Sequence, residues 1–362
     1  MLLNNKLYQG IARRVQLLPR GRYKASKIVG LLWKNDPNWD PWILKDGDVY
    51  RLFYLVAQKG SPLWWKGESR IYGAISTDMK NWKDLGVVLA PEPANPWESG
   101  RMLAGCTYKE DGVYYLFYSA AGKGEVEIFN EGIGLATSTD GLHWQRYSNS
   151  EFLKPDHNNR WYGQFKRDLF GYEYDHFQWR DPYIFKDPKT SKYYMFICAY
   201  LKEGGHGTFR GCVGLAVADN ITGPYELLPP AATPVVDGTN ESPYYEMERP
   251  QVIYKNGKYH LFFSCWTQWL HPKWIEKVGR KNLTDSSLYW YISDNITGPF
   301  KPVSDKPVCR GSERTGIYGT NFFPASDKPE EFIAYGWYYR LMTLGISPLV
   351  KVRWDNNSIK IG

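Results

Sequence analysis

The sequence predicts an all-β fold, a five-bladed β-propeller built as a single domain. Three observations support this prediction. Convincing amphipathic helices are scarce, one hairpin pattern recurs four times, and a second strand pattern follows each hairpin at a regular distance. Repeated units of this kind are typical of propellers, in which four-stranded blades surround a central channel.

The first repeated pattern is a polar turn followed by alternating aromatic residues that end in Leu-Phe or Met-Phe. It occurs as KDGDVYRLFY, EDGVYYLFYS, PKTSKYYMFI and KNGKYHLFFS, at residues 45–54, 110–119, 188–197 and 255–264. Asp-Gly, Asn-Gly or a longer polar turn before a strand of period two indicates a β-hairpin. Each copy therefore predicts one hairpin.

The second pattern is a strand with small residues, an Asp turn and an aromatic residue that opens a last strand. Its four copies carry the turn residues Asp78, Asp140, Asp219 and Asp294. Together the two patterns define a unit of four strands in roughly 55–70 residues. A fifth, weaker unit covers residues 320–361 and is expected to close the ring with the N-terminal segment. Because five units fill the chain, we expect residues 1–362 to form one domain, with residues 1–30 as an extension that packs on or closes the ring.

Composition and charge argue against several classes of function. The 362 residues carry a net charge of +7, but no Lys/Arg run is dense enough to indicate a nucleic-acid-binding surface. No apolar run is long enough to predict a membrane span, and the N-terminus lacks the apolar core of a signal peptide. The five cysteines are scattered and show no CxxC spacing, which indicates buried free thiols in a reducing compartment. We therefore expect a cytoplasmic protein without a cofactor, a nucleic-acid partner or a membrane partner.

Aromatic residues make up 17% of the chain, with 16 Trp, 28 Tyr and 16 Phe. Many aromatic side chains belong in the core of a β-rich fold. Flat apolar rings also stack on the faces of sugars, so the same composition suits a carbohydrate site. Composition alone leaves both interpretations open.

Acidic residues precede a proline near the start of three units, in WDPWILKDG, WRDPYIFKD and MERPQVIYKNG. Counted back from the Phe that ends each hairpin, they lie at similar distances: 13 residues for Asp40, 15 for Asp181 and 14 for Glu248. Asp36, in NDPN, lies 17 residues back and does not fit, so the repeat selects Asp40 over Asp36. The second unit has Ala104 and Gly105 at this place, so the fold does not require an acid there.

The strand that each acid opens is predicted to be the innermost strand of its blade. Innermost strands line the channel, so their equivalent ends converge and bring the three carboxylates together. Carboxylates gathered in a partly desolvated pocket repel one another and separate their pKa values, which gives a fold no advantage. A turn-forming role before proline explains any one of these acids, but three in register indicate a functional site.

Clustered carboxylates suit glycoside cleavage. One acid protonates the leaving oxygen, and a second attacks the anomeric carbon or activates water. A third can hold sugar hydroxyls and stabilise the positive charge of the transition state. A divalent metal is the alternative use, but calcium loops usually draw several oxygens from one short segment, and no DxDxDG loop is present. We therefore predict a sugar reaction and no metal site.

The surroundings of Glu248 favour the acid/base role. It is flanked by Met247 and aromatic residues, and partial desolvation would raise its pKa. Glu246, two residues away, would raise that pKa further by repulsion if it lies on the same strand face. A surface position explains Glu246 equally well.

The other two acids suit roles in which the carboxylate stays ionised. Asp40 is short and rigid and lies between Trp39 and Trp42, which suits a nucleophile. Asp181 follows Arg180, whose guanidinium can hold it ionised. That arrangement suits a carboxylate that binds hydroxyls without changing its own protonation.

These motifs resemble the three acidic motifs of the five-bladed propeller glycosidases that act on β-fructofuranosides, glycoside hydrolase families 32 and 68. The resemblance covers about residues 33–340, and ERP after an acidic residue is closest to family 68, the levansucrase and inulosucrase group. It implies that Asp40 is the nucleophile, Asp181 the transition-state stabiliser and Glu248 the acid/base, with retention through a covalent fructosyl-enzyme. The family pattern adds sugar-contacting candidates at Trp39, Ser99 (in WESG), Arg180, Arg249 and Tyr318. Retention implies that the Asp40 and Glu248 carboxyls lie about 5–5.5 Å apart.

The sequence departs from the family pattern in two respects, and the second bears on the leaving group. Family 32 enzymes usually carry a C-terminal β-sandwich, for which this chain has no room. Eighteen residues after the acid/base Glu, levansucrases often have a basic residue beside the glucosyl unit, whereas this chain has Trp266. Trp266 belongs to an aromatic rim that suits a different aglycone or acceptor, although packing between blades explains any single member: Trp64, Trp65, Trp266, Trp269 and Trp274.

The predicted function is therefore a retaining hydrolase or transglycosidase with a β-fructofuranoside substrate and, for transfer, a sugar or metabolite acceptor. An inverting arabinofuranosidase or xylosidase like those of family 43 has the same fold and order of acids, but Arg180 before Asp181 argues against it. The alternative from another class is a non-catalytic sugar-binding or protein-binding propeller, against which three acids in register argue. The choice between hydrolysis and transfer depends on the geometry of the pocket and stays open.

Overall fold

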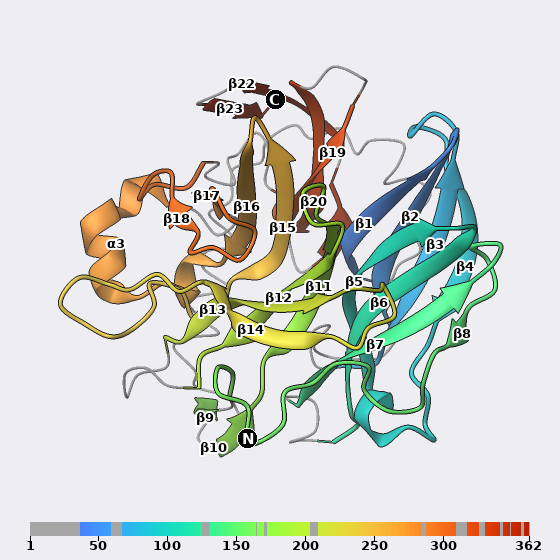
Figure 1. Cartoon of the computed structure of the whole chain (residues 1–362), viewed down its shortest axis with the longest axis horizontal. Coiled ribbons are helices and arrows are strands. Elements are labelled where there is room, and N and C mark those ends of the chain that lie inside the picture. The colour runs from blue at the N-terminus through green and yellow to red at the C-terminus, as the bar shows by residue number, and fades with distance from the viewer. Residues whose placement is uncertain are drawn as a thin grey trace.

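In a computed structural model, five antiparallel sheets surround a common axis, as the predicted propeller requires (Figure 1). The structure describes residues 37–58, 67–124, 130–163, 165–169, 172–202, 209–283, 287–308, 317–325, 330–340, 343–347, 349–355 and 358–361. The predicted fold class is confirmed. The predicted role of residues 1–30 in the ring lies outside the described residues.

Blades 1 to 4 are four-stranded meanders whose strands pair in chain order. Blade 1 contains β1 (Asn38–Asp46), β2 (Val49–Ala57), β3 (Ser69–Ser76) and β4 (Lys83–Leu89). Blade 2 contains β5 (Arg101–Glu110), β6 (Val113–Ala121), β7 (Glu131–Ser138) and β8 (Gln145–Arg146). Blade 3 contains β11 (Trp179–Lys186), β12 (Tyr193–Tyr200), β13 (Gly211–Ala218) and β14 (Glu226–Ala232). Blade 4 contains β15 (Glu248–Lys255), β16 (Lys258–Cys265), β17 (Ser287–Ser293) and β18 (Lys301–Pro302).

Blade 5 is built from the C-terminal part of the chain and packs against blade 1. Its strands are β19 (Tyr318–Pro324), β20 (Glu331–Arg340), β21 (Thr343–Ile346), β22 (Val350–Asp355) and β23 (Ser358–Ile361). They run in the order β19-β20-β22-β23, and β21 also pairs with β20. The backbone N–H of Ile346 donates to the side chain of Asn38 at 3.2 Å, and that of Ile43 donates to the Tyr335 hydroxyl at 3.3 Å. These bonds join the last blade to the first.

The first strand of every blade is its innermost strand, as predicted. Together these strands line a cavity of about 370 Å³ on the propeller axis. Each strand contributes one or more lining residues, among them Ile43, Thr107, Ile184, Gln251 and Phe322. Asp181 and Arg249 also line this cavity. The starts of the inner strands therefore meet at one end of the channel.

A repeated polar contact links neighbouring blades where their first strands end. In blade 1 the carboxylate of Asp46 accepts hydrogen bonds from Lys109 and Tyr114 of blade 2. In blade 2 the carboxylate of Glu110 accepts hydrogen bonds from blade 3 in the same way, from Lys186 and Tyr193. In blade 3 Asp187 accepts from Tyr259 of blade 4 at 2.6 Å. A Lys-Asp or Lys-Glu pair at the end of the inner strand therefore recurs in blades 1 to 3, and its acid links each of these blades to the next one.

Much of the aromatic content is core. The largest fully buried side chains are Trp179, Trp354, Tyr118, Tyr162, Tyr200, Tyr244, Tyr259, Tyr289, Tyr291, Phe117, Phe196 and Phe262. In blade 5 the Trp354 ring packs edge-on against Phe262 and Trp290 of blade 4, with centroids 5.4 and 5.9 Å apart. Such pairs bury large areas and lock neighbouring sheets together.

Helices are few in the described part of the chain, as the sequence predicts. They are η1 (Pro96–Glu98), η3 (Thr267–Trp269), α3 (Pro272–Val278) and η4 (Arg280–Asn282). A separate hairpin is formed by β9 (Phe165–Leu169) and β10 (Tyr172–His176). No helix among these residues has the length and apolar character needed to cross a bilayer. Four of the cysteines are free thiols, as predicted, and Cys309 lies outside the described residues.

Candidate active site

Each innermost strand carries a β-bulge near its start, where its register against the second strand shifts. We call the first residue of each bulge the bulge residue; in blades 1 to 5 these are Asp40, Leu103, Asp181, Arg249 and Gly319. We call the residue before it the pre-bulge residue; these are Trp39, Met102, Arg180, Glu248 and Tyr318. The two sets supply most of the site described below.

The bulges correct the register predicted for the three acids. Asp40 and Asp181 are both bulge residues, as expected, but Glu248 is a pre-bulge residue, so its equivalence to the two aspartates is wrong by one position. Blades 1 and 4 have inner hairpins of equal length, and the residue 13 before Phe262 is Arg249. The position predicted for blade 2 is also displaced along its strand.

In blade 2 the bulge residue is Leu103, and neither Ala104 nor Gly105 occupies that place. The prolines mark the register better than the hairpin ends do. Each second bulge position in blades 1, 3 and 4 is a proline: Pro41, Pro182 and Pro250.

Four of the five bulge residues have a left-handed backbone. The φ angles are +45° for Asp40, +57° for Asp181, +54° for Arg249 and +59° for Gly319. Only glycine adopts this region at little cost, and other residues in it commonly mark functional sites. The repeated geometry places four successive bulge residues of the ring at one end of the channel.

Asp40 is a partly buried carboxyl held by an indole. The Nε1–H of Trp337, in β20, donates to Asp40 Oδ1 at 2.7 Å. Burial raises the pKa of Asp40 to about 7; Arg249 opposes this rise, Asp181 adds to it by repulsion, and the Trp337 bond opposes it. Burial thus works against the ionised form expected for a nucleophile, and Arg249 and Trp337 favour that form.

Glu248 receives a hydrogen bond on each carboxyl oxygen. The Nη2 of Arg180 donates to Oε1 at 2.8 Å, and the Tyr318 hydroxyl donates to Oε2. The side chain is 16% exposed, so it keeps access to solvent. Burial and then repulsion from Glu246 raise its pKa well above the ordinary value, although Arg180 opposes this. A carboxyl of this kind suits a proton donor.

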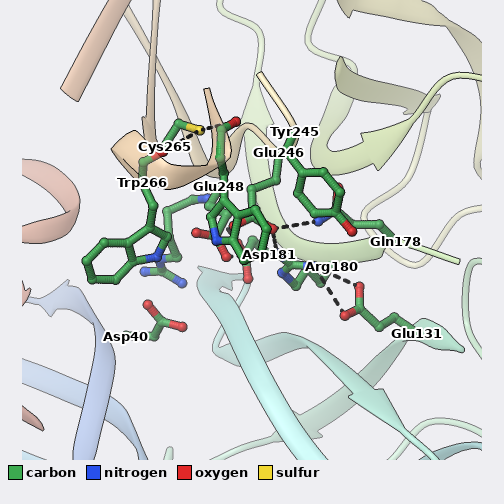
Figure 2. A network of polar contacts seen from close by, with 12 residues as sticks. Asp40, Glu131, Gln178, Arg180, Asp181, Tyr245, Glu246, Glu248, Cys265 and Trp266 are labelled. Carbon is green, nitrogen blue, oxygen red and sulfur yellow. Dashed lines mark hydrogen bonds and ion pairs between the residues drawn. The ribbon is translucent and has the colours of Figure 1, made fainter. Parts of the chain in front are cut away.

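Asp181 acts on both of the other acids, because its negative charge raises the pKa of Asp40 and the pKa of Glu248. It is 4% exposed, and its Oδ2 accepts the backbone N–H of Arg249 at 3.0 Å. Figure 2 shows the three acids grouped in one place, as predicted. The expected Arg180–Asp181 pair is replaced by contacts of Arg180 with three glutamates.

Arg180 is the centre of this polar network (Figure 2). Its Nη1 lies 3.2 Å from both carboxylate oxygens of Glu131, in β7. Its Nη2 donates to Glu246 Oε2 and to Glu248 Oε1, each at 2.8 Å. Gln178 donates to the same Glu246 oxygen at 3.1 Å. The arginine therefore joins blade 2 to the acid of blade 4.

An aromatic wall stands beside the acids. It consists of Trp266, Tyr318 and Trp337; the first two rings stack at 4.1 Å and 19°, and Trp337 meets both edge-on. Two of its members also donate hydrogen bonds to the carboxyls of Glu248 and Asp40. The wall thus combines a flat apolar surface with the donors that hold the acids.

The other described members of the predicted aromatic rim pack against neighbouring aromatic rings. Trp269 packs on Tyr245 at 5.0 Å. Trp274 is 5% exposed and belongs to the core, against Tyr244. Trp64 and Trp65 lie outside the described residues. Within the described chain, no group of three or more His, Cys, Asp or Glu side chains is placed to hold a metal ion.

Comparison with known proteins identifies the family. The model of the glycosyl hydrolases family 32 N-terminal domain matches residues 31–210. A levansucrase from Rahnella aquatilis is 27% identical over 287 residues, which cover 68% of this chain and 59% of the levansucrase. These matches and the three acidic motifs support membership of the family 32/68 glycoside hydrolases. The chain spans about three fifths of the length of this relative.

Solved structures agree on the fold of this family 32/68 chain. An inulosucrase from Halalkalicoccus jeotgali bound to kestose is 22% identical, with a TM-score of 0.69 over 91% of this chain and 87% of that one. A thermostable family-43 glycoside hydrolase is 16% identical, with a TM-score of 0.59 over 90% of this chain and 93% of that one. The propeller is therefore common to both families.

Three side chains for which the family 32/68 resemblance implies sugar contacts are buried or hydrogen-bonded within the protein. Arg249 is 5% exposed, and its guanidinium donates to Pro41, Gly105 and Asn321 oxygens at the channel. Ser99 donates to the Pro96 carbonyl and accepts the backbone N–H of Lys123. Trp39 is 4% exposed and belongs to a core cluster. Direct sugar contacts of these three residues stay a prediction.

Several residues of the family 32/68 site escaped the sequence patterns. They are Glu131, Gln178, Trp337 and Gly319. Glu131 and Trp337 lie outside the repeat that located the acids, in β7 and β20. Gly319 had a weak signal: it follows Tyr318 in IYGTN, at the bulge of the fifth blade.

Proposed function

We propose that this chain is a retaining glycosidase or transglycosidase that acts on a β-fructofuranoside through a covalent fructosyl-enzyme. One observation carries the proposal: two carboxyls of different environment meet at one end of the channel. Glu248 favours the protonated form; burial also raises the pKa of Asp40, but the indole hydrogen bond from Trp337 and the charge of Arg249 favour its ionised form. Family membership supports the substrate class.

In the first step the ionised Asp40 attacks the anomeric carbon of the fructosyl unit. Glu248 gives its proton to the leaving oxygen as the glycosidic bond breaks. Arg180 and Tyr318 then stabilise the Glu248 carboxylate, because each already donates to one of its oxygens. Asp181 serves the positively charged ring of the transition state and binds sugar hydroxyls.

In the second step Glu248 acts as the base. It takes the proton of water, or of a sugar hydroxyl, as that oxygen displaces Asp40 from the fructosyl unit. Water gives hydrolysis, and a sugar or metabolite alcohol gives transfer. Two displacements at the same carbon retain its configuration.

The names of the relatives support a sucrose-like donor, since they include a levansucrase and an inulosucrase bound to kestose. The aromatic wall offers a flat apolar surface beside Glu248, the residue proposed to protonate the leaving group. Trp266 follows β16 directly and stacks on the tyrosine that holds Glu248. We propose that this wall receives the aglycone or the acceptor.

Incubation with sucrose, raffinose and aryl fructofuranosides tests the proposal. Products of the wild type and of Asp40→Asn are compared by mass spectrometry. We expect release or transfer of fructosyl units by the wild type and loss of at least three orders of magnitude in the variant. Undiminished turnover by Asp40→Asn would remove the proposed nucleophile.

An inverting arabinofuranosidase or xylosidase is the alternative that the shared propeller with a family-43 hydrolase keeps open. The two proposals differ in the anomer that is released first. NMR of the product within the first turnovers distinguishes them, because a retaining enzyme releases the β-anomer of a β-furanoside. An inverting enzyme would also need its two carboxyls about 6.5–9.5 Å apart.

A further inference from the structure

Glu131 is a buried carboxylate that reaches the network from blade 2, the blade whose bulge residue is not acidic. It begins β7 and is 2% exposed. Both of its oxygens face Arg180 Nη1 at 3.2 Å, and Oε2 also accepts the backbone N–H of Trp179 at 3.0 Å. The Nη2 of a second buried arginine, Arg101, lies 3.9 Å from Oε1. Blade 2 therefore contributes its acid from its third strand.

We propose that Glu131 is a positioning residue of this site, which aims Arg180 at Glu248 and balances the charge around it. The Nη1 edge of the guanidinium is held by Glu131, and this leaves Nη2 directed at Glu246 and Glu248. The inference rests on the proposed function, in which Glu248 must begin the reaction with a proton.

Among the ion-paired groups around Arg180 and Glu131, the charges balance while Glu248 is neutral. Arg101 and Arg180 supply two positive charges, and Glu131 and Glu246 supply two negative charges. The raised pKa of Glu248 agrees with this balance. Without the charge of Glu131, less negative charge opposes Arg180, which favours the ionised form of Glu248 as a partner of this arginine.

Other charged and titratable groups surround the two glutamates. Those that face Glu248 or Glu131 are Arg180 and Asp181 of β11, Glu246, Tyr318 of β19, Cys198 of β12, Cys265 of β16, Arg101 of β5 and Lys154. Among the described residues, Glu131 is the acceptor for Arg180 Nη1. Its replacement therefore changes both the direction and the charge balance of that arginine.

Glu131→Gln tests the proposal, because the amide keeps the size of the side chain and an acceptor oxygen but removes the charge. Blade 2 offers a matched control in Glu98, which is 0% exposed, pairs with Arg146 at 2.7 Å and accepts from Tyr118 at 2.9 Å. Glu98→Gln removes an equally buried ion pair outside the network. Glu131→Asp keeps the charge but shortens its reach.

The decisive readout is the pH profile of kcat/KM on a fructofuranoside. The basic limb of this profile is the range in which activity falls because Glu248 loses its proton. We expect Glu131→Gln to move this limb down by about one pH unit, which lowers activity about tenfold at a fixed pH on that limb. Glu98→Gln should leave both limbs in place, and Glu131→Asp should keep the basic limb while raising KM. An unmoved basic limb in Glu131→Gln, with a stability loss like that of Glu98→Gln, would overturn the proposal.

A second readout needs no turnover, so it separates this inference from the proposed function. The free energy of unfolding is measured against pH for the wild type, Glu248→Gln, Glu131→Gln and the double variant. A raised folded pKa makes the stability from Glu248 present at low pH and lost as pH rises through that pKa. We expect this Glu248-dependent loss to end at a lower pH in the Glu131→Gln background. An identical pH dependence in both backgrounds would refute the inference, even if no fructofuranoside were turned over.

Discussion

The guanidinium of Arg249, in blade 4, donates to the carbonyl oxygen of Pro41, in blade 1, at 2.9 Å across the propeller axis. The same group donates to Gly105 in blade 2 and to Asn321 in blade 5, while its backbone N–H donates to Asp181 in blade 3. One residue thus bonds with all of the other four blades. It lines the channel, and its charge also acts on Asp40.

Arg249→Met should affect stability and Asp40 together. Loss of the guanidinium removes hydrogen bonds to three buried oxygens, which should lower the free energy of unfolding by about 2–4 kcal/mol. The acidic limb of the pH profile is the range in which activity falls because Asp40 gains a proton. Arg249 opposes the raised pKa of Asp40, so its removal should move this limb to higher pH. Urea unfolding and the pH dependence of kcat/KM measure the two effects.

Arg146→Met is the matched control for that variant. Arg146 donates to Glu98 and to the Ala90 carbonyl, and neither bond involves the three acids. It should cost stability without moving the acidic limb. If Arg249→Met lost stability but kept its acidic limb, Arg249 would be a structural link only.

Glu246 and Tyr318 should shift the basic limb in opposite directions. Glu246 raises the pKa of Glu248 by repulsion, so Glu246→Gln should move the basic limb to lower pH. The Tyr318 hydroxyl lowers that pKa through its hydrogen bond, so Tyr318→Phe should move the limb to higher pH. A pH profile of kcat/KM for each variant checks the signs. Shifts in the same direction would contradict the assignment of that limb to Glu248.

Gly319 should resist substitution because of its place in the site. Its φ is +59°, and a Cβ there would lie 3.1 Å from Trp337 Nε1 and 3.2 Å from both Asp40 Oδ1 and Arg249 Cγ. Gly47 has the same φ of +59° but nothing within 4 Å of such a Cβ. Gly47→Ala therefore measures the backbone cost alone, about 1 kcal/mol.

Gly319→Ala should lose more stability than Gly47→Ala and should also lose activity, since the neighbours that must move hold Asp40. Thermal unfolding and kcat/KM provide the comparison. Equal stability losses with unchanged activity would show that the contacts around Gly319 relax freely.

The sequence was a good guide to the residues that belong to the repeat. Asp40 and Asp181 follow from the register of the inner strands, since a repeated strand places equivalent positions at equivalent points of the ring. The register failed by one position at Glu248 because it was measured through the hairpin, whereas the bulge itself is marked by proline. An alignment on Pro41 and Pro250 places Arg249 at the bulge.

The partners of the acids could not be predicted in the same way. Glu131 lies 49 residues before Arg180, and Trp337 lies 297 residues after Asp40. These contacts exist only once the blades have closed into a ring, and no local pattern records which strand of one blade meets which strand of the next. The aromatic composition had the same ambiguity, because core and site use the same residue types.

Asp40→Asn should stabilise the protein at alkaline pH. The pKa of Asp40 rises from 3.8 to about 7 on folding, so its stability contribution is complete below pH 4 and is lost as pH rises through 7. The loss amounts to at most about 4 kcal/mol, and asparagine escapes it because it carries no charge. Unfolding at pH 4 and pH 8 should show a gain for the variant at pH 8 only.

Asp187→Asn is the control of opposite sign. Despite burial, hydrogen bonds from Tyr259 and Thr190 lower the pKa of Asp187. Its stability contribution is therefore present above the unfolded pKa and lost as pH falls, so the variant should be less stable at pH 8. A gain at pH 8 for both variants would point to a general charge effect and not to the site.

Trapping of the covalent intermediate tests the central claim most directly. Glu248→Gln is incubated with an aryl fructofuranoside, whose leaving group needs little protonation, and the protein is then digested and analysed by mass spectrometry. Without its base the variant should accumulate the intermediate, and the peptide that contains Asp40 should carry the mass of one fructosyl unit. The adduct should be absent from the double variant Asp40→Asn/Glu248→Gln. Turnover with an inverted product and no adduct, or an adduct on a different carboxylate, would contradict the account.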